Sequence, residues 1–129
     1  MRFVTDTHCL FWYLEADPQL SAASKKLFDK QEWEHKIFIP TVVLAELLYI
    51  NRKYGGPPFS KTLDALEMNK QFEVSPLSAP IIRKTIPLTH FEMHDALIVA
   101  TALHLDLPLM TVDTAIIRSG LVQTLNPSI

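Results

Sequence analysis

The sequence predicts an α/β fold in which helices cover both faces of a mainly parallel sheet. Short apolar runs of strand length alternate along the chain with longer segments of helical spacing, which is the pattern of parallel-sheet proteins. Four acids lie inside or at the ends of these apolar segments: Asp6, Glu46, Asp95 and Asp113. Because an isolated charge is costly to bury, they predict a shared cation, and such folds bind ligands at the carboxyl edge of the sheet.

Length and composition predict a single domain spanning residues 1–129. Apolar residues make up 48% of the chain and charged residues 20%, which is globular composition. Cys9 is the only cysteine, so an internal disulfide is excluded and stability depends on packing. No apolar run is long enough to cross a bilayer and the N-terminus lacks a signal-peptide pattern, so we expect a cytoplasmic protein that does not bind a membrane.

The formal net charge of −2 argues against a general electrostatic attraction to nucleic acid. Binding of a polyanion would therefore need local basic groups or bound cations. The basic residues are scattered along the chain, and scattered lysines and arginines are usually only solvated.

The first predicted elements are a strand at residues 2–6 and a helix at residues 7–14 that is apolar nearly all round. A helix of that kind must be buried or covered by a partner. Ser21 is a good N-cap for the next helix, and Pro40 ends a short strand at residues 37–39.

Glu46 lies in a predicted helix that begins at its N-cap, Thr41, and ends in the polar Asn51-Arg52-Lys53. Residues three and four positions away are neighbours on a helix surface, and around Glu46 they are Val42, Val43, Tyr49 and Ile50. The charge has no polar face to join, which predicts that it points into a site. The alternative is an ordinary exposed glutamate on a helix with an apolar surface.

The C-terminal half continues the alternation after the one strong loop signal, Gly55-Gly56-Pro57-Pro58. Helices are predicted at residues 60–69, 78–86 and 93–105, and strands at residues 72–74, 109–112 and 121–125 with a short turn of helix before the last.

Three of the acids share one kind of position. Asp6 and Asp113 end apolar runs, and Asp95 opens the most apolar helix, so each alone would more often be an N-cap than a catalytic group. Together with Glu46 they would repel one another unless a hard divalent cation neutralised them. Ligation by oxygen alone favours Mg²⁺ or Mn²⁺, and such ions position water and stabilise charge on a phosphate.

Four segments of the sequence resemble the four acidic motifs of PIN domains, and most of all those of VapC-type toxins from toxin–antitoxin pairs. They are VTDTHCLFWYL at residues 4–14, LAEL at residues 44–47, HDALIVATAL at residues 94–103 and LMTVD at residues 109–113. The order and spacing match over nearly the whole chain. The resemblance implies a three-layer α/β/α sandwich with a central, mainly parallel sheet.

The resemblance also implies a function. It predicts an endoribonuclease that hydrolyses RNA phosphodiester bonds with metal-activated water and is silenced by a cognate antitoxin protein. By correspondence of motifs, the catalytic acids that bind Mg²⁺ or Mn²⁺ are Asp6, Glu46, Asp95 and Asp113. Thr111 is expected to orient these acids without binding the metal itself. Some members carry a further acid after the last motif, where this chain has Thr114-Ala115-Ile116-Ile117. A second ion would therefore be weakly held or arrive with the substrate.

Two other functions stay open. A Mg²⁺-binding receiver-type signalling domain has a similar length and strand-end acids, but it needs an acidic pair after its first strand and a lysine after its last. Here Thr7 and His8 follow Asp6, and no lysine follows Lys84. The second alternative is a non-catalytic binding module with the PIN fold.

Two remaining features concern histidines and partners. His90 and His94 have the spacing of a helical zinc site, but His90 lies in a predicted loop and no HExxH is present, which argues against zinc. The apolar helix at residues 7–14, with Trp12 and Tyr13, is a candidate interface for an antitoxin or a homodimer, and core packing is the alternative.

Overall fold

The computed structural model describes all 129 residues, and its centre is an all-parallel sheet of five strands. The strands are β1 (Arg2–Thr5), β2 (Lys36–Pro40), β3 (Phe72–Ser75), β4 (Leu109–Met110) and β5 (Thr124–Leu125). The helices are α1 (Thr7–Leu14), α2 (Ala22–Asp29), α3 (Thr41–Tyr54), α4 (Phe59–Met68), α5 (Ala79–Thr85), α6 (Met93–Leu105) and α7 (Thr114–Ser119). None of these helices has the length and apolar character needed to cross a membrane.

The predicted α/β fold is confirmed, with differences at the ends of elements. The bounds of α6 agree with the prediction, whereas β4 and β5 each contain only two residues and α7 is a helix of six residues. Thr41 was expected as the N-cap of α3, but Pro40 holds that position. Instead, the Thr41 hydroxyl donates to the Ser75 carbonyl oxygen and joins the start of α3 to the end of β3.

The strand order β3-β2-β1-β4-β5 places β1 at the centre of the sheet. From β1 the chain builds outward through β2 to β3, then crosses back to add β4 on the other side of β1. Because crossovers between parallel strands are right-handed, this reversal places the helices in two layers, α1 to α4 on one face and α5 to α7 on the other. The carboxyl ends of β1 and β4 meet where the direction reverses, with Thr5 paired to Met110. Sheets of this type bind ligands at that point.

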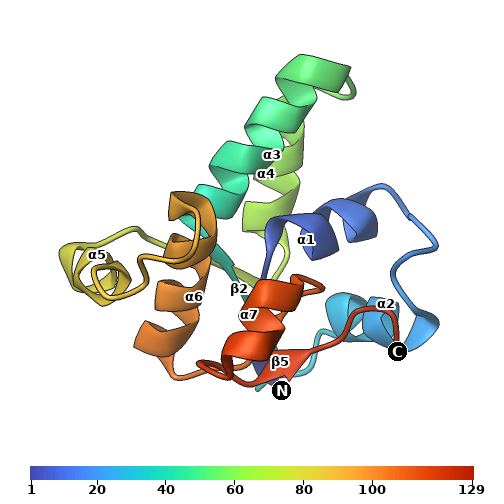
Figure 1. Cartoon of the computed structure of the whole chain (residues 1–129). Coiled ribbons are helices and arrows are strands. Elements are labelled where there is room, and N and C mark those ends of the chain that lie inside the picture. Colours follow the sequence, from blue (N-terminus) through green and yellow to red (C-terminus); the bar gives the residue numbers. More distant parts are fainter.

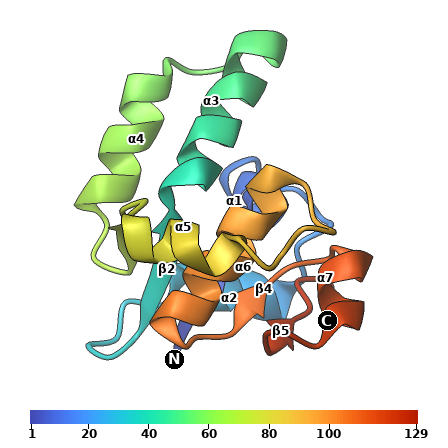
Figure 2. The same cartoon turned by 60° about the vertical axis from the view of Figure 1, so that its left-hand side comes forward.

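Helices α3 and α4 lie side by side and rise together away from the sheet, as Figures 1 and 2 show from two directions. The predicted glycine and proline loop joins them. Gly55 ends α3 at a φ of 81°, in the left-handed region that favours glycine. The hairpin of α3 and α4 therefore projects from the carboxyl edge of the sheet, and Glu46 lies on its first helix.

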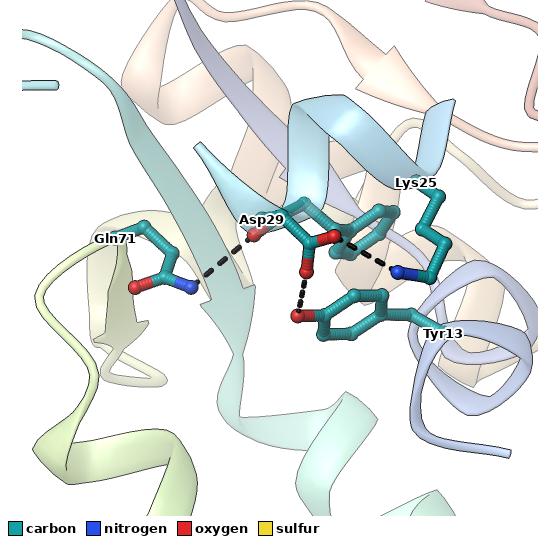
Figure 3. Close-up of polar contacts among 5 residues, drawn as sticks. Tyr13, Lys25, Asp29 and Gln71 are labelled. Atoms are coloured by element: carbon teal, nitrogen blue, oxygen red, sulfur yellow. Dashed lines mark hydrogen bonds and ion pairs between the residues drawn. The ribbon is translucent and has the colours of Figure 1, made fainter. Parts of the chain in front are cut away.

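Aromatic rings and polar contacts join α1 and α2 to the sheet. Phe28 packs edge-to-face on Phe3 and lies parallel to Tyr13 at a centroid distance of 4.8 Å. The Tyr13 hydroxyl donates to Asp29 Oδ1 at 2.5 Å, and Lys25 contacts Asp29 Oδ2 at 3.0 Å (Figure 3). Burial and the bond to Asp29 raise the pKa of Tyr13 to about 12.

The apolar helix α1 is therefore covered largely by the chain itself. Cys9 and Leu10 are buried, Trp12 and Tyr13 are half-buried, and Leu14 is exposed. Core packing accounts for Tyr13, and the polar contacts of Figure 3 account for its hydroxyl.

Candidate active site

The four predicted acids line one cavity of about 340 Å³ at the carboxyl edge of the sheet. Asp6 follows β1 and Asp113 follows β4, while Glu46 comes from α3 and Asp95 from α6. We call this cavity the acid pocket; its lining is Asp6, Thr7, His8, Glu46, Glu92, Asp95, Ile98, Val112 and Asp113. No lysine or arginine belongs to this lining, so the chain itself places no permanent positive charge among the acids.

Asp6 and Asp113 are fixed by the helices that they begin. Asp6 Oδ1 accepts from the Cys9 backbone N–H at 2.9 Å, and Asp113 Oδ1 accepts from the Ile116 N–H at 2.9 Å. Both acids are thus N-caps. Each carboxylate retains a second oxygen, Oδ2, outside its cap bond.

Thr111 holds the turn that leads to Asp113. Its side chain is fully buried, and Thr111 Oγ1 accepts from the backbone N–H of Asp113 at 3.0 Å. The hydroxyl therefore fixes the direction in which the chain leaves β4. The supporting role of Thr111 in a metal site stays a prediction.

Glu46 is held by two groups next to other acids. Thr7, the neighbour of Asp6, donates its hydroxyl to Glu46 Oε1 at 2.5 Å. His94, the neighbour of Asp95, has Nδ1 at 3.4 Å from Glu46 Oε2. The Glu46 side chain is 28% exposed, so it lies at the wall of the pocket and not on the outer surface of α3.

Asp95 lies in the first turn of α6 and caps nothing. Glu92 holds the N-cap position there and makes no side-chain cap bond. As the sequence predicts, Asp95 lies at the start of this helix and does not directly follow a strand, because α5 and a loop separate it from β3. Burial raises the pKa of Asp95, and the charges of Asp113, Glu46, Glu92 and Asp6 raise it further. Negative potential therefore converges on this carboxyl group.

Comparison with known families identifies the chain. The PIN domain family matches residues 3–120. The chain belongs to this family. PIN domains are generally nucleases that use divalent metal ions. No curated protein matches the sequence of this PIN domain significantly.

Solved structures share the fold of this PIN domain. VapBC2 of Rickettsia felis, bound to a DNA fragment from its promoter, has a TM-score of 0.73 and 20% identity over 98% of both chains. VapBC-1 of nontypeable Haemophilus influenzae has a TM-score of 0.73 and 16% identity over 100% of both chains. FitAcB of Neisseria gonorrhoeae has a TM-score of 0.72 and 21% identity over 97% of both chains.

The acid pocket of this PIN domain suits a hard divalent cation by the chemistry of its donors. They are carboxylate oxygens. Burial is the larger cause of the raised pKa of Asp95, and the neighbouring acids, whose charge a cation would neutralise, raise it further. In the present arrangement, no three histidine, cysteine or acidic side chains lie close enough together to ligate one ion. Glu46 Oε1 is occupied by Thr7, and one oxygen each of Asp6 and Asp113 is occupied by a helix N–H.

Sequence reasoning missed two members of the pocket. Thr7 contacts Glu46 across 39 positions of the chain, and Glu92 lines the pocket three residues before Asp95. Thr7 directly follows Asp6, but only the packing of α1 on α3 shows its partner. Glu92 has a local signal, because an acid three residues before Asp95 falls near the same helix terminus.

Proposed function

We propose that this PIN domain is a divalent-metal-dependent endoribonuclease and the toxin of a toxin–antitoxin pair. The observation that supports it is one pocket in which the acids of four separate motifs come together, with no lysine or arginine among its lining residues. The chain alone offers no permanent cationic group to an RNA phosphate there. A divalent cation would supply that charge and would activate water for attack on the phosphodiester bond.

The chain's own residues have distinct parts in this proposal. Asp6 and Asp113 are the rigid members, because helix caps fix both of them and Thr111 fixes the turn before Asp113. Thr7 orients the Glu46 carboxylate through its hydrogen bond, and Asp95 is the fourth acid of the pocket and comes from α6. All four acids would hold Mg²⁺ or Mn²⁺ once their side chains turn toward the ion, and Ile98 and Val112 form the apolar part of the wall.

We propose a cognate antitoxin as the protein partner. Two of the similar structures are described as VapBC2 and FitAB, and a further one is described as a toxin–antitoxin complex from Klebsiella pneumoniae. A groove of about 310 Å³ between α1, α3 and α4 offers an apolar surface; Phe11, Leu14, Leu47, Ile50 and Phe59 line it. An apolar helix of the antitoxin would fit such a groove. Light scattering on the isolated chain would test the homodimer that we also expect.

Membership of the PIN family removes the receiver-domain alternative. The non-catalytic binding module differs from the enzyme only in activity, so an assay separates them. We expect the purified chain, freed of antitoxin, to cut single-stranded RNA with Mg²⁺ or Mn²⁺ and to be silent in EDTA, with products that carry a 5′-phosphate and a 3′-hydroxyl.

The matched control for this assay is Asp64→Asn. Asp64 is an exposed acid on α4 outside the acid pocket, so its loss should leave cleavage unchanged. Cleavage at an equal rate in EDTA would refute the metal-dependent mechanism. Absence of cleavage of any RNA, together with normal folding, would favour the binding module.

A further inference from the structure

A second cleft opens beside the acid pocket and shares Thr7, His8 and Glu46 with it. Its volume is about 390 Å³, and its other walls are Ala45, Tyr49 and Ile50 of α3 and His94 of α6. We call it the side cleft. Because the two cavities share a wall, a strand whose phosphate lies among the acids would bring a neighbouring nucleotide to the side cleft.

Three rings from three different helices border the side cleft. Tyr49 comes from α3, His8 from α1 and His94 from α6. The Tyr49 residue is 65% exposed and the His94 side chain is 61% exposed. Tyr13 shows the contrasting case, since its ring packs on Phe28 and its hydroxyl is bound to Asp29. Packing of the core therefore explains Tyr13 but gives no reason for the Tyr49 ring at the edge of the cleft.

The chemistry of the side cleft suits a base better than a phosphate. No lysine or arginine belongs to its lining, and Glu46 is acidic, so the cleft has no fixed cation for a phosphate. Its surface is mainly apolar and aromatic. Nucleobases that are free of a duplex stack on tyrosine and histidine rings, and this stacking tolerates any sequence because every base has a π-face.

We propose that the side cleft binds one unpaired nucleobase next to the scissile phosphate of an RNA strand, with Tyr49 as the stacking surface. The inference rests on the proposed ribonuclease function, because the acid pocket sets the place of the phosphate. It also gives a physical reason for the single-stranded RNA substrate that the proposed function already expects. A base inside a duplex is stacked on its own neighbours, so the side cleft selects single-stranded RNA or an unpaired loop.

The test measures binding apart from cleavage. A short single-stranded RNA carries 2-aminopurine, whose emission falls when it stacks, at one position at a time. With Mn²⁺ present, it is titrated into Asp95→Asn protein, in which we expect cleavage to be at least about tenfold slower. We expect emission to fall at one position, and we expect Tyr49→Ala in that background to weaken binding about tenfold and to abolish the fall in emission.

Two matched variants control for loss of exposed aromatic surface. Tyr54→Ala removes another exposed tyrosine of α3 that does not line the side cleft, and it should bind like the parent. Tyr49→Phe keeps the ring and should bind within about twofold of the parent, since stacking needs the ring face. Tyr49 is mostly exposed, so all three variants should melt like the parent.

Four outcomes decide the inference. An abasic nucleotide at the quenched position should make Tyr49→Ala and its parent bind equally. Unchanged binding and emission in Tyr49→Ala would overturn the base site, even if wild-type protein cuts RNA. Loss of antitoxin binding in Tyr49→Ala with RNA binding intact would also overturn it and would make the cleft a protein contact. If base binding depends on Tyr49 but wild-type protein cuts no RNA, the base site stands and the proposed activity fails.

Discussion

Thr7 donates its hydroxyl to Glu46 Oε1 at 2.5 Å, and this bond joins the first residue of α1 to the middle of α3. Because Thr7 directly follows Asp6, this bond fixes the position of Glu46 relative to Asp6. His94 does the same from the other side, because it precedes Asp95 and contacts Glu46 Oε2 at 3.4 Å.

Replacing Thr7 should therefore impair activity without unfolding the protein. Thr7→Val keeps the buried shape but removes the donor to Glu46. We expect RNA cleavage to fall by about tenfold to a hundredfold, because small misplacements of reacting groups cost rates of that order. The loss of stability should be about 1 kcal/mol or less, since Glu46 remains partly hydrated. Thr7→Ser retains the hydroxyl, and failure of this variant to restore cleavage would contradict the positioning role.

Asp95→Asn should separate function from stability. We expect cleavage to fall by at least about tenfold, a barrier increase of roughly 1.4 kcal/mol. Without divalent ions, burial and four acids raise the folded-state pKa of Asp95, so the folded state binds more protons and its stability falls as pH rises through that pKa. The variant removes this penalty and should melt at the same or a higher temperature than wild type.

The response to Mn²⁺ gives a second measurement on the same variant. Mn²⁺ should raise the Tm of wild type more than that of Asp95→Asn, because a ligand that binds the folded state stabilises it in proportion to its affinity. A variant that lost stability and kept full activity would show that Asp95 is structural.

His35 should make stability depend on pH. Its Nε2 contacts the Leu27 carbonyl oxygen at 2.6 Å, which requires hydrogen on Nε2, and Nδ1 is buried without a partner. Burial lowers the pKa of His35, so protonation of Nδ1 is disfavoured in the folded state. Stability should be complete above the ordinary histidine pKa of about 6.5 and fall as pH drops below it. Urea titrations between about pH 5 and 8 would measure this slope, and His35→Phe should remove its histidine component.

Leu14→Asp should weaken antitoxin binding while sparing cleavage. Leu14 is 39% exposed and lines the apolar groove between α1, α3 and α4. A charge there would have to be desolvated by an apolar partner, so we expect at least a tenfold loss of affinity in calorimetry. Ile82→Asp is the matched control, because Ile82 is 43% exposed on α5 and lies outside the groove. Equal effects of the two variants would place the antitoxin elsewhere.

The helix α6 shows how far local sequence signals reach. Its predicted and observed bounds agree, because seven consecutive buried residues follow its first turn and Asp106 ends it in a left-handed conformation. The two-residue strands β4 and β5 could not be delimited in this way. The predicted segment of β4 continues past its last paired residue, and that of β5 begins before its first paired residue, so only the partner strands decide the extent of pairing.

The residues of the acid pocket also differ in whether local sequence or tertiary packing determines their positions. Asp6 and Asp113 could be placed from the sequence because a strand end and a helix start specify their positions locally. The contact of Thr7 with Glu46 depends on how α1 packs against α3, which no local pattern encodes. Repulsion among the acids was expected from the sequence, and it does contribute to the raised pKa of Asp95, but burial is the larger cause. Burial of that group depends on tertiary packing.

The capping role of Asp6 and Asp113 limits the ways in which such a protein can lose its activity. Asp6 and Asp113 each begin a helix, so alanine at either position should cost about 1 kcal/mol of stability in addition to any catalytic loss. Glu46 and Asp95 cap nothing and carry no such structural cost. A lineage drifting toward inactivity would therefore shed Glu46 and Asp95 first and keep both caps. Asparagine caps a helix as well as aspartate does, so Asn at position 6 or 113 is the change that silences the pocket while leaving its scaffold intact.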